Sequence, residues 1–124
     1  MTHLAEMAGF TEEDTGKIEI AVDEACTNVI EHAYANMNPK PPIRLEVETL
    51  DNRLIVDIVD RGRAFDYDTY VPPKFPDHWN EGHNRGVGLY LIRKCMDDSS
   101  YTRLPDQSNR LRLIKNLEST SVRE

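Results

Sequence analysis

The stretch from residue 20 to residue 34 reads IAVDEACTNVIEHAY, and it sets the architecture expected for the whole chain. Its apolar residues return every three or four positions, and the same stripe begins slightly earlier, so one long amphipathic helix is predicted to cover a hydrophobic core. The stripe consists of Ile18, Ala21, Val22, Ala25, Cys26, Val29, Ile30 and Ala33. Thr11, followed by three acidic residues, fits the N-cap and first turn of this helix.

The remaining segments predict a sheet and a second helix. Apolar and polar residues alternate on both sides of an Asp51-Asn52 turn, which is typical of a β-hairpin, and a second hairpin is expected near the end of the chain. The predicted strands are 43–48, 53–59, 101–104 and 111–117, and the second helix spans 87–96. This order predicts an α+β fold, a two-layer sandwich with helices on one face of a mostly antiparallel sheet.

The bulk properties exclude several classes of protein. A chain of 124 residues fits one domain, residues 1–124, and a net charge of -7 argues against a nucleic-acid binder. No apolar run approaches the roughly 20 residues that span a bilayer, and we expect no signal peptide. Cys26 and Cys95 fall on apolar helix faces, so we expect reduced core cysteines in a cytoplasmic protein and no zinc site.

Residues 61–85 lose all periodicity. The segment contains Pro72, Pro73 and Pro76 and separates the first hairpin from the second helix. A loop of this length within a small domain is usually functional. We therefore expect a lid or binding loop over approximately residues 61–85.

Three polar residues on the first predicted helix are spaced four apart and lie along one edge of it. They are Glu24, Asn28 and His32. Along the helix this row approaches the apolar stripe, so its side chains are expected to face a cleft beside the sheet. Asn28 offers a neutral oxygen suited to a hard cation such as Mg²⁺, and Glu24 is a candidate to receive or orient a proton. A solvated helix face stays open as the alternative.

Two glycine-bearing segments supply further candidates. Asp60 ends an apolar strand, where its carboxylate can accept a hydrogen bond from an adenine amino group, and Gly62 lets the backbone approach a flat ring closely. A strand-ending turn is the alternative. Gly86 and Gly88 precede the second predicted helix, whose free N–H groups and dipole favour phosphate. Arg85 adds positive charge there, unless it is an ordinary surface arginine.

Together these segments resemble the sequence boxes of the GHKL ATPase/kinase superfamily, and more closely those of the anti-sigma factor serine-protein kinases, the RsbW-like group. Residues 20–34 are similar to the N box of that family. Residues 60–66, DRGRAFD, look like its first glycine box, and residues 86–92, GVGLYLI, look like its second. The resemblance covers roughly Thr11 to Leu117.

The resemblance implies a GHKL or Bergerat-type ATP-binding fold and a role for each matching residue. It implies that Asn28 binds the Mg²⁺ that accompanies ATP, that Asp60 reads the adenine, and that Glu24 is the candidate catalytic base. The other nucleotide-binding residues that it implies are Gly62, Ala64, Arg85, Gly86, Val87, Gly88 and Leu89. Ala64 departs from the family pattern, because a glycine or proline is usual at that position.

The resemblance also implies partners. The family phosphorylates a serine of a small anti-anti-sigma partner of the STAS type, sequesters a sigma factor and forms homodimers. The family usually has a strand and a full helix before the N box, whereas residues 2–9 are too short for both, so we expect an N-terminally short variant or fragment. One alternative function is a nucleotide-gated binding module that transfers no phosphate. Another, the ATP-binding part of a histidine kinase, is disfavoured because no phosphoacceptor helix bundle is found.

Overall fold

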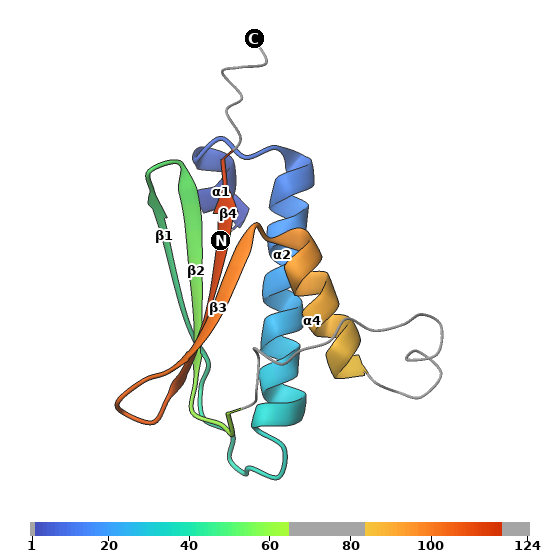
Figure 1. Cartoon of the computed structure of the whole chain (residues 1–124), viewed down its shortest axis with the longest axis vertical. Helices are drawn as coiled ribbons and strands as arrows, with labels where there is room; N and C mark the ends of the chain where they lie inside the picture. Colours follow the sequence, from blue (N-terminus) through green and yellow to red (C-terminus); the bar gives the residue numbers. More distant parts are fainter. Residues whose placement is uncertain (1, 65–83, 118–124) are drawn as a thin grey trace.

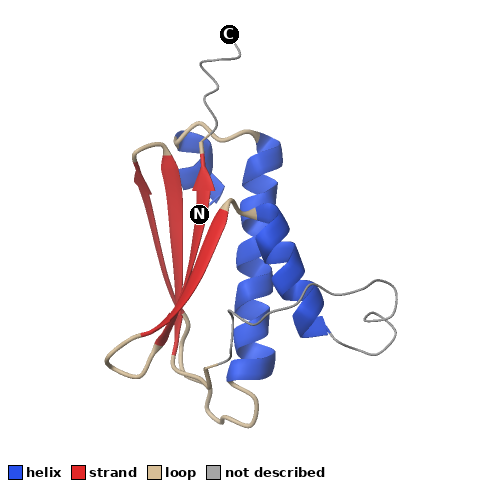
Figure 2. Cartoon of the chain, viewed as in Figure 1, coloured by secondary structure: helices blue, strands red, loops and turns tan. Residues whose placement is uncertain are grey.

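The computed structural model describes residues 2–64 and 84–117, with only the backbone described for residues 2 and 84–88. Within these ranges it has two layers, a four-stranded sheet and the helices that pack on one of its faces (Figures 1 and 2). The helical elements are α1 (Thr2–Met7), α2 (Glu12–Asn28), the π-helix η1 (Val29–Ala33) and α4 (Asn84–Cys95). The strands are β1 (Arg44–Leu50), β2 (Arg53–Asp60), β3 (Asp98–Arg103) and β4 (Asn109–Asn116).

The sheet has the strand order β1-β2-β4-β3, and all three strand pairs are antiparallel. The first hairpin turns at Asp51 and Asn52, whose φ angles of 52° and 63° are those of a type I′ turn. The pairing of β2 with β4 places Asp60 directly opposite Asn109. The predicted α+β sandwich is confirmed, and the sheet in the described residues is wholly antiparallel.

Helix α2 begins where the sequence predicts. The Thr11 hydroxyl accepts a hydrogen bond from the N–H of Asp14 at 3.1 Å, and acidic residues occupy the first turn, where the helix dipole favours them. The predicted stripe is buried over most of its length, because Ile18, Ala21 and Ala25 are each at most 2% exposed. Ile30 departs from the prediction, since it is 47% exposed.

The departure at Ile30 follows from a change of helix type after Asn28. In η1 the N–H of Tyr34 reaches back five residues to the carbonyl of Val29, at 2.8 Å. A π-turn is wider than an α-turn, so the residues in it no longer follow the α-helical spacing. The predicted row of Glu24, Asn28 and His32 therefore keeps its regular spacing only as far as Asn28. Single π-turns inside helices frequently occur at functional sites.

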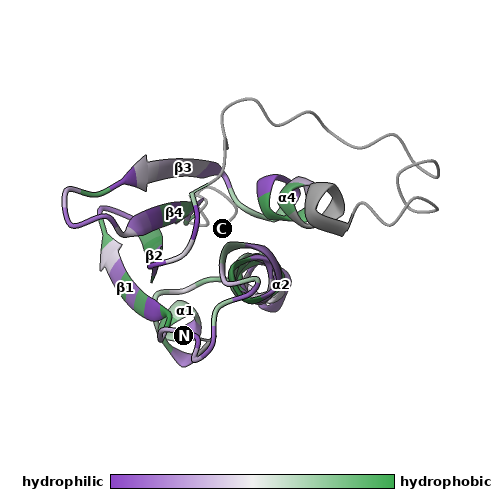
Figure 3. Cartoon of the chain, turned by 90° about the horizontal axis from the view of Figure 1, so that it is seen from below, coloured by the Kyte–Doolittle hydropathy of each residue, from purple (hydrophilic) through white to green (hydrophobic). Residues whose placement is uncertain are grey.

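The core lies between the sheet and the helices. Leu54, Val56 and Ile58 of β2 and Leu111 and Leu113 of β4 face the helices and are at most 9% exposed. Seen end-on, α2 and α4 form one layer against the strands (Figure 3). From α4, the core takes Leu89, Ile92 and Cys95. Both cysteines are free, with Cys95 buried and Cys26 partly buried against this core, as predicted.

The opposite face of the sheet is less polar than strand alternation predicts. β2 is buried from Leu54 to Asp60 because it is a central strand between β1 and β4. On this face Arg112 donates two hydrogen bonds to Asp57, each 2.8 Å long. This pairing raises the pKa of Arg112. β1 is one of the two edge strands of the described sheet, and it carries the exposed side chains of Leu45 and Leu50.

Other predicted boundaries also differ in the structure. β3 begins at Asp98, three residues before its predicted start, and β4 begins at Asn109, two residues before its predicted start. Residues 2–7 form the short helix α1, which no periodicity indicated. The helix ends at Met7, and Gly9, two residues later, has a φ of +101° that suits glycine. Helix α4 begins at Asn84, three residues earlier than predicted, so Gly86 and Gly88 lie inside its first turns and not before it. Most of the predicted lid, residues 65–83, lies outside the described residues.

Candidate functional site

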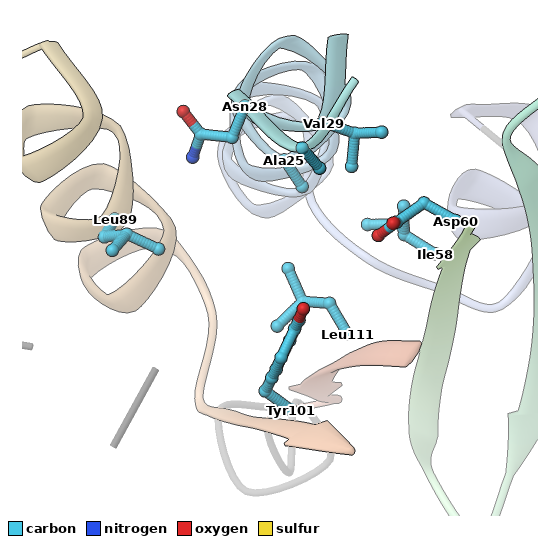
Figure 4. A pocket seen from close by; sticks show the side chains of 9 residues that line it. Ala25, Asn28, Val29, Ile58, Asp60, Leu89, Tyr101 and Leu111 are labelled. Atoms are coloured by element: carbon cyan, nitrogen blue, oxygen red, sulfur yellow. The ribbon is translucent and has the colours of Figure 1, made fainter. Parts of the chain in front are cut away.

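A cavity opens between the helix layer and the sheet, at the end of the molecule where α2 stops and β2 ends (Figures 1 and 4). The atom-free space between its lining residues is about 400 Å³, a figure that includes open solvent, so the enclosed part is much smaller. The helices contribute Ala25, Asn28, Val29, Ala33 and Leu89 to its lining, and the strands contribute Ile58, Asp60, Tyr101 and Leu111. A mostly apolar cavity with a few convergent polar groups is the usual form of a small-molecule site.

Two of the predicted polar residues meet in this cavity. Figure 4 shows Asn28 on the side of α2 that faces α4, and Asp60 across the cavity at the end of β2. The ring of Tyr101 and the side chain of Leu111 approach from the sheet. Asn28 and Asp60 thus line one cavity, although they come from different layers of the fold.

Asp60 is 5% exposed, and within the described residues only one of its two carboxylate oxygens is hydrogen-bonded. Its Oδ1 accepts a hydrogen bond from the N–H of Gly62 at 2.8 Å and another from the Nδ2 of Asn109 at 3.0 Å. Its Oδ2 makes no hydrogen bond with the described residues. An ionised carboxylate offers acceptor sites only. Asp60 thus presents a fixed acceptor to the cavity, suited to a ligand that donates an N–H.

Gly62 is held against the end of the helix layer. A Cβ at this position would lie 2.5 Å from the carbonyl oxygen of Ala33 and 2.7 Å from the ring of Tyr34. The N–H of the next residue, Arg63, donates to the same Ala33 carbonyl at 3.1 Å. Gly62 is absent from the cavity lining, so close packing against η1 is the reason that the structure gives for this glycine.

Tyr34 also stabilises the contact between the end of η1 and the segment after β2. It is 1% exposed, and its hydroxyl accepts the N–H of Arg61 at 3.1 Å and donates to the carbonyl of Pro42 at 3.3 Å. One side chain therefore joins the end of η1, the end of β2 and the segment that leads into β1. This cross-link fixes where Asp60 emerges from the sheet.

Asn28 is the polar residue on the helix side of the cavity, and Glu24 lies near it in the same helix. Both are half-buried, and neither side chain makes a hydrogen bond or ion pair with the described residues. Glu24 lies one turn before Asn28 in α2 and is absent from the cavity lining. Side chains that keep their hydrogen-bonding capacity are available to a ligand or to a second protein.

The other predicted site residues are placed as follows. Leu89 lines the cavity and is 5% exposed. Ala64 is exposed at the end of a described segment. Arg85, Gly86, Val87 and Gly88 belong to the first turns of α4, and their side chains are outside the described part of the structure. The N-terminal end of α4 lies at the same end of the molecule as the cavity (Figure 1).

Sequence reasoning missed Asn109 and Tyr101. Asn109 lies between the predicted strands 101–104 and 111–117, yet it is fully buried and donates hydrogen bonds to Asp60 Oδ1 and to the carbonyl of Gly62, both at 3.0 Å. Tyr101 belongs to a predicted strand and has no predicted role, yet it lines the cavity. The strand order would have revealed both, because β4 pairs with β2 and β3 pairs with β4.

The electrostatic features near the site are few. Burial, and to a lesser extent the charge of Asp23, raises the pKa of the Cys26 thiol. Hydrogen bonds from Ser108, and then the nearby Arg61, lower the pKa of Asp106 in the turn before β4. Among residues 2–64 and 84–117, no group of three or more His, Cys, Asp or Glu side chains could hold a metal ion. No helix of this part of the chain is both long and apolar enough to cross a membrane.

Comparison with known sequences gives a family match over residues 1–115, to the histidine kinase-like ATPase domain. The chain is 35% identical over 105 residues to the serine-protein kinase RsbW of Bacillus velezensis, covering 79% of this chain and 63% of that protein. It is 36% identical over 106 residues to RsbW of Bacillus subtilis, with the same coverages. It is 37% identical over 95 residues to RsbW of Staphylococcus aureus, covering 73% of this chain and 60% of that protein.

Solved structures agree on the fold. The histidine kinase domain of the Erythrobacter litoralis EL346 blue-light activated histidine kinase has a TM-score of 0.61 at 22% identity, covering 89% of this chain and 48% of that chain. The Acinetobacter baumannii histidine kinase AdeS has a TM-score of 0.58 at 15% identity, covering 84% of this chain and 47% of that chain. The chain spans less than two thirds of the length of the relatives and structures that it matches.

Proposed function

This chain belongs to the histidine kinase-like ATPase domain family, and from that premise we propose that it is an ATP-dependent serine-protein kinase of the anti-sigma factor type. The cavity between α2, β2 and α4 is the proposed nucleotide site. The observation that carries the proposal is the meeting of Asn28 and Asp60 in one apolar cavity. Among the described residues, the Asn28 side-chain amide and the Asp60 Oδ2 have no hydrogen-bond partner. The similarity to RsbW kinases supports the choice of reaction.

The base lies at the Asp60 end in this proposal. Asp60 Oδ2 accepts the adenine 6-amino group, while Gly62 and Asn109 hold Oδ1 in place. Tyr101, Ile58 and Leu111 supply apolar and aromatic surface for the ring. Gly62 serves the base indirectly, by letting the segment after β2 pack closely on η1.

The phosphates lie toward Asn28 and the start of α4. The first turns of α4, residues 85–88, offer backbone N–H groups and the positive end of a helix dipole. Mg²⁺ is usually bound in nucleotide sites by one or two protein oxygens together with phosphate oxygens and water. The Asn28 amide oxygen has no partner among the described residues and fits that donor set. When bound, the ion would neutralise charge on the phosphates.

Glu24 serves the incoming serine. It lies one turn before Asn28 on the same helix edge, half-buried and without a hydrogen bond to the described residues. A serine hydroxyl is a weak nucleophile at neutral pH, so it needs alignment with the γ-phosphate and a group that receives its proton. Glu24 orients the hydroxyl and accepts the proton in the proposed mechanism.

The proposed partners follow from the RsbW resemblance. The phosphoacceptor is a serine of an anti-anti-sigma protein of the STAS type, and the regulated partner is a sigma factor, in the cytoplasm. A homodimer is also proposed, because β1 is an edge strand of the described sheet with exposed Leu45 and Leu50. Light scattering at high concentration that finds only monomer would remove the homodimer.

The alternative function is a module that binds a nucleotide and a partner but transfers no phosphate. Two measurements separate these functions. Calorimetry with ATP and Mg²⁺ should show binding by the wild type and loss of the Mg²⁺-dependent part of that binding in Asn28→Ala. Asp60→Asn should bind ATP about a hundredfold more weakly, because the substitution replaces an acceptor that faces the cavity with a donor. Wild-type affinity in both variants would contradict the site.

The second measurement is transfer of label from ATP to a serine of an anti-anti-sigma protein. Phosphoserine on the partner supports the kinase. Nucleotide binding without any transfer by the wild type favours the binding module. Arg44→Gln is a matched control for binding, because Arg44 is an exposed residue of β1 that, within the described part of the chain, pairs with Glu46 on the same strand.

A further inference from the structure

The buried amide of Asn109 has a single possible orientation. Its Oδ1 accepts a hydrogen bond from Arg103 Nη1 at 2.9 Å. Its Nδ2 donates to Asp60 Oδ1 and to the carbonyl oxygen of Gly62, both at 3.0 Å. Arginine only donates, whereas a carboxylate and a carbonyl only accept. Turning the amide over would therefore place like groups against each other on both sides.

Arg103 connects this buried amide to the surface. It lies opposite Asn109 in the pairing of β3 with β4, and its second terminal nitrogen, Nη2, donates to Gln107 Oε1 at 3.1 Å. The side chain of Arg103 is exposed, while Asn109 is 0% exposed and Asp60 is 5% exposed. A continuous chain of hydrogen bonds thus runs from the β3–β4 turn through Arg103 and Asn109 to Asp60.

This chain determines what Asp60 offers to the cavity. Both donors, the Gly62 N–H and the Asn109 amide, bind the same oxygen, Oδ1. The other oxygen, Oδ2, keeps its full accepting capacity among the described residues. Without Asn109 the carboxylate would lose one of two contacts that fix its rotation. The direction of Oδ2 therefore depends on Asn109, and the orientation of Asn109 depends on Arg103.

We propose that Arg103 and Asn109 are positioning residues that aim Asp60 at the base and make the cavity select bases with a 6-amino group. Adenine donates a hydrogen from that position, so it matches Oδ2. Guanine presents an acceptor oxygen there and is repelled. This inference rests on the proposed adenine-nucleotide site and adds the residues outside the cavity lining that set its selectivity.

A merely structural role for the same contacts is the competing explanation. Asn109 also ties the end of β2 to the start of β4, so its loss could weaken every ligand equally. Arg103 is the better residue to change, because its side chain is exposed and its removal leaves the core intact. Arg44→Leu is the control, since Arg44 is also an exposed arginine, but it lies on β1 at the opposite edge of the sheet from β3 and pairs with Glu46.

The experiment compares two ligands in calorimetry: ADP, and the diphosphate of purine riboside, which lacks only the 6-amino group. The wild type should prefer ADP by roughly ten- to hundredfold, the range of one hydrogen bond to a charged acceptor. Arg103→Leu should reduce this preference to about threefold or less, mainly by weakening ADP. Arg44→Leu should keep the wild-type preference, and Arg103→Lys, which retains one donor, should keep part of it.

The outcomes distinguish this inference from the proposed function. A wild type that binds ADP preferentially, with Arg103→Leu weakening both ligands equally or neither, overturns the positioning role and leaves the nucleotide site standing. A wild type that binds neither ligand overturns both. Thermal unfolding without ligand verifies that each variant is folded. If Arg103→Leu does not fold, Arg103→Lys takes its place in the test. An unchanged preference for ADP in Arg103→Lys, in a structure where the new lysine does not contact Asn109, also overturns the inference.

Discussion

Asp60 and Asn109, at the strand end of the cavity, are at most 5% exposed and are joined by hydrogen bonds to each other and to Gly62. Asn28 and Glu24, at the helix end, are half-buried and make no hydrogen bond with the described residues. The two ends therefore differ in what holds them. The strand end is fixed by contacts within the protein, whereas the helix end keeps its polar groups available.

This difference has a physical basis. A fully buried polar group without a partner costs about 1–3 kcal/mol, so the strand end must be paired before any ligand arrives. A half-buried group is solvated by water and bears little of that cost. Changes at the strand end should therefore lower the stability of the fold together with ligand binding. Changes at the helix end should alter function and leave stability almost unchanged.

The largest expected effect is at the helix end. In Glu24→Gln the proposed proton acceptor is lost, so phosphoryl transfer to the serine partner should fall by roughly 10²–10⁴-fold. ADP affinity and the free energy of unfolding should stay at wild-type values, because Glu24 has no hydrogen bond to the described residues. Single-turnover transfer, calorimetry and urea unfolding measure the three quantities.

Glu31→Gln provides the control for that change, since Glu31 is an exposed acid of η1 that follows Asn28. It should leave transfer within about twofold of wild type, the small effect expected for a surface substitution. Unchanged transfer together with lost nucleotide binding in Glu24→Gln would make Glu24 a structural residue and would remove the contrast between the two ends.

The next effect is on stability at the strand end. Gly62→Ala places a Cβ 2.5 Å from the carbonyl oxygen of Ala33, and backbone atoms cannot move aside cheaply. We expect a loss of about 2–3 kcal/mol in the free energy of unfolding, as for overpacking in a core. Weaker ADP binding should accompany it, because η1 and the Gly62 N–H that holds Asp60 would shift apart.

Gly16→Ala is the matched control for this prediction. Gly16 lies inside α2, and a Cβ there meets nothing within 4 Å. Replacing a helical glycine with alanine should raise stability by about 0.5–1 kcal/mol. Urea unfolding of both variants gives the comparison. A Gly62→Ala protein as stable as the wild type would show that η1 does not press on the end of β2.

The sequence predicted the helix end of the site better than the strand end. Asn28 and Glu24 lie in one helix, where spacing of four residues is enough to place them together. The helix start at Thr11 was equally local, because a hydroxyl and three acids within one turn determine it. The π-turn after Asn28 could not be predicted, since it depends on the packing of Tyr34 and on the contact between the Ala33 carbonyl and Arg63.

The strand end depends on a pairing that periodicity does not encode. Alternation predicts a strand but not its neighbour, and Asn109 lies 49 positions after Asp60 in the sequence. The order β1-β2-β4-β3 brings the two together. For the same reason the sequence analysis predicts that Gly62 contacts the ligand. In the structure, Gly62 instead packs closely against the end of η1.

The smallest expected effect concerns the turn that supports the strand end. Asp106 Oδ1 accepts hydrogen bonds from the N–H and the hydroxyl of Ser108, and its Oδ2 pairs with Arg61 at 3.2 Å. These contacts lower the pKa of Asp106 in the folded state. A depressed folded pKa means that the contribution to stability is present above the unfolded pKa, about 3.9, and is lost as pH falls through the folded value.

Asp106→Asn should therefore be slightly less stable than wild type between pH 5 and pH 7, and this difference should shrink as pH falls below about 4. The effect stays small because the Asp106 side chain is exposed to solvent and screened by it. Urea unfolding at several pH values measures it. Asp51→Asn, in the exposed turn between β1 and β2, controls for the loss of one carboxylate. A stability difference between Asp106→Asn and wild type that stays constant down to pH 3 would show that the charge of Asp106 does not contribute. The turn would then order Asn109 through its backbone. The rigidity of the strand end would rest on Arg103, Asn109 and Gly62 alone.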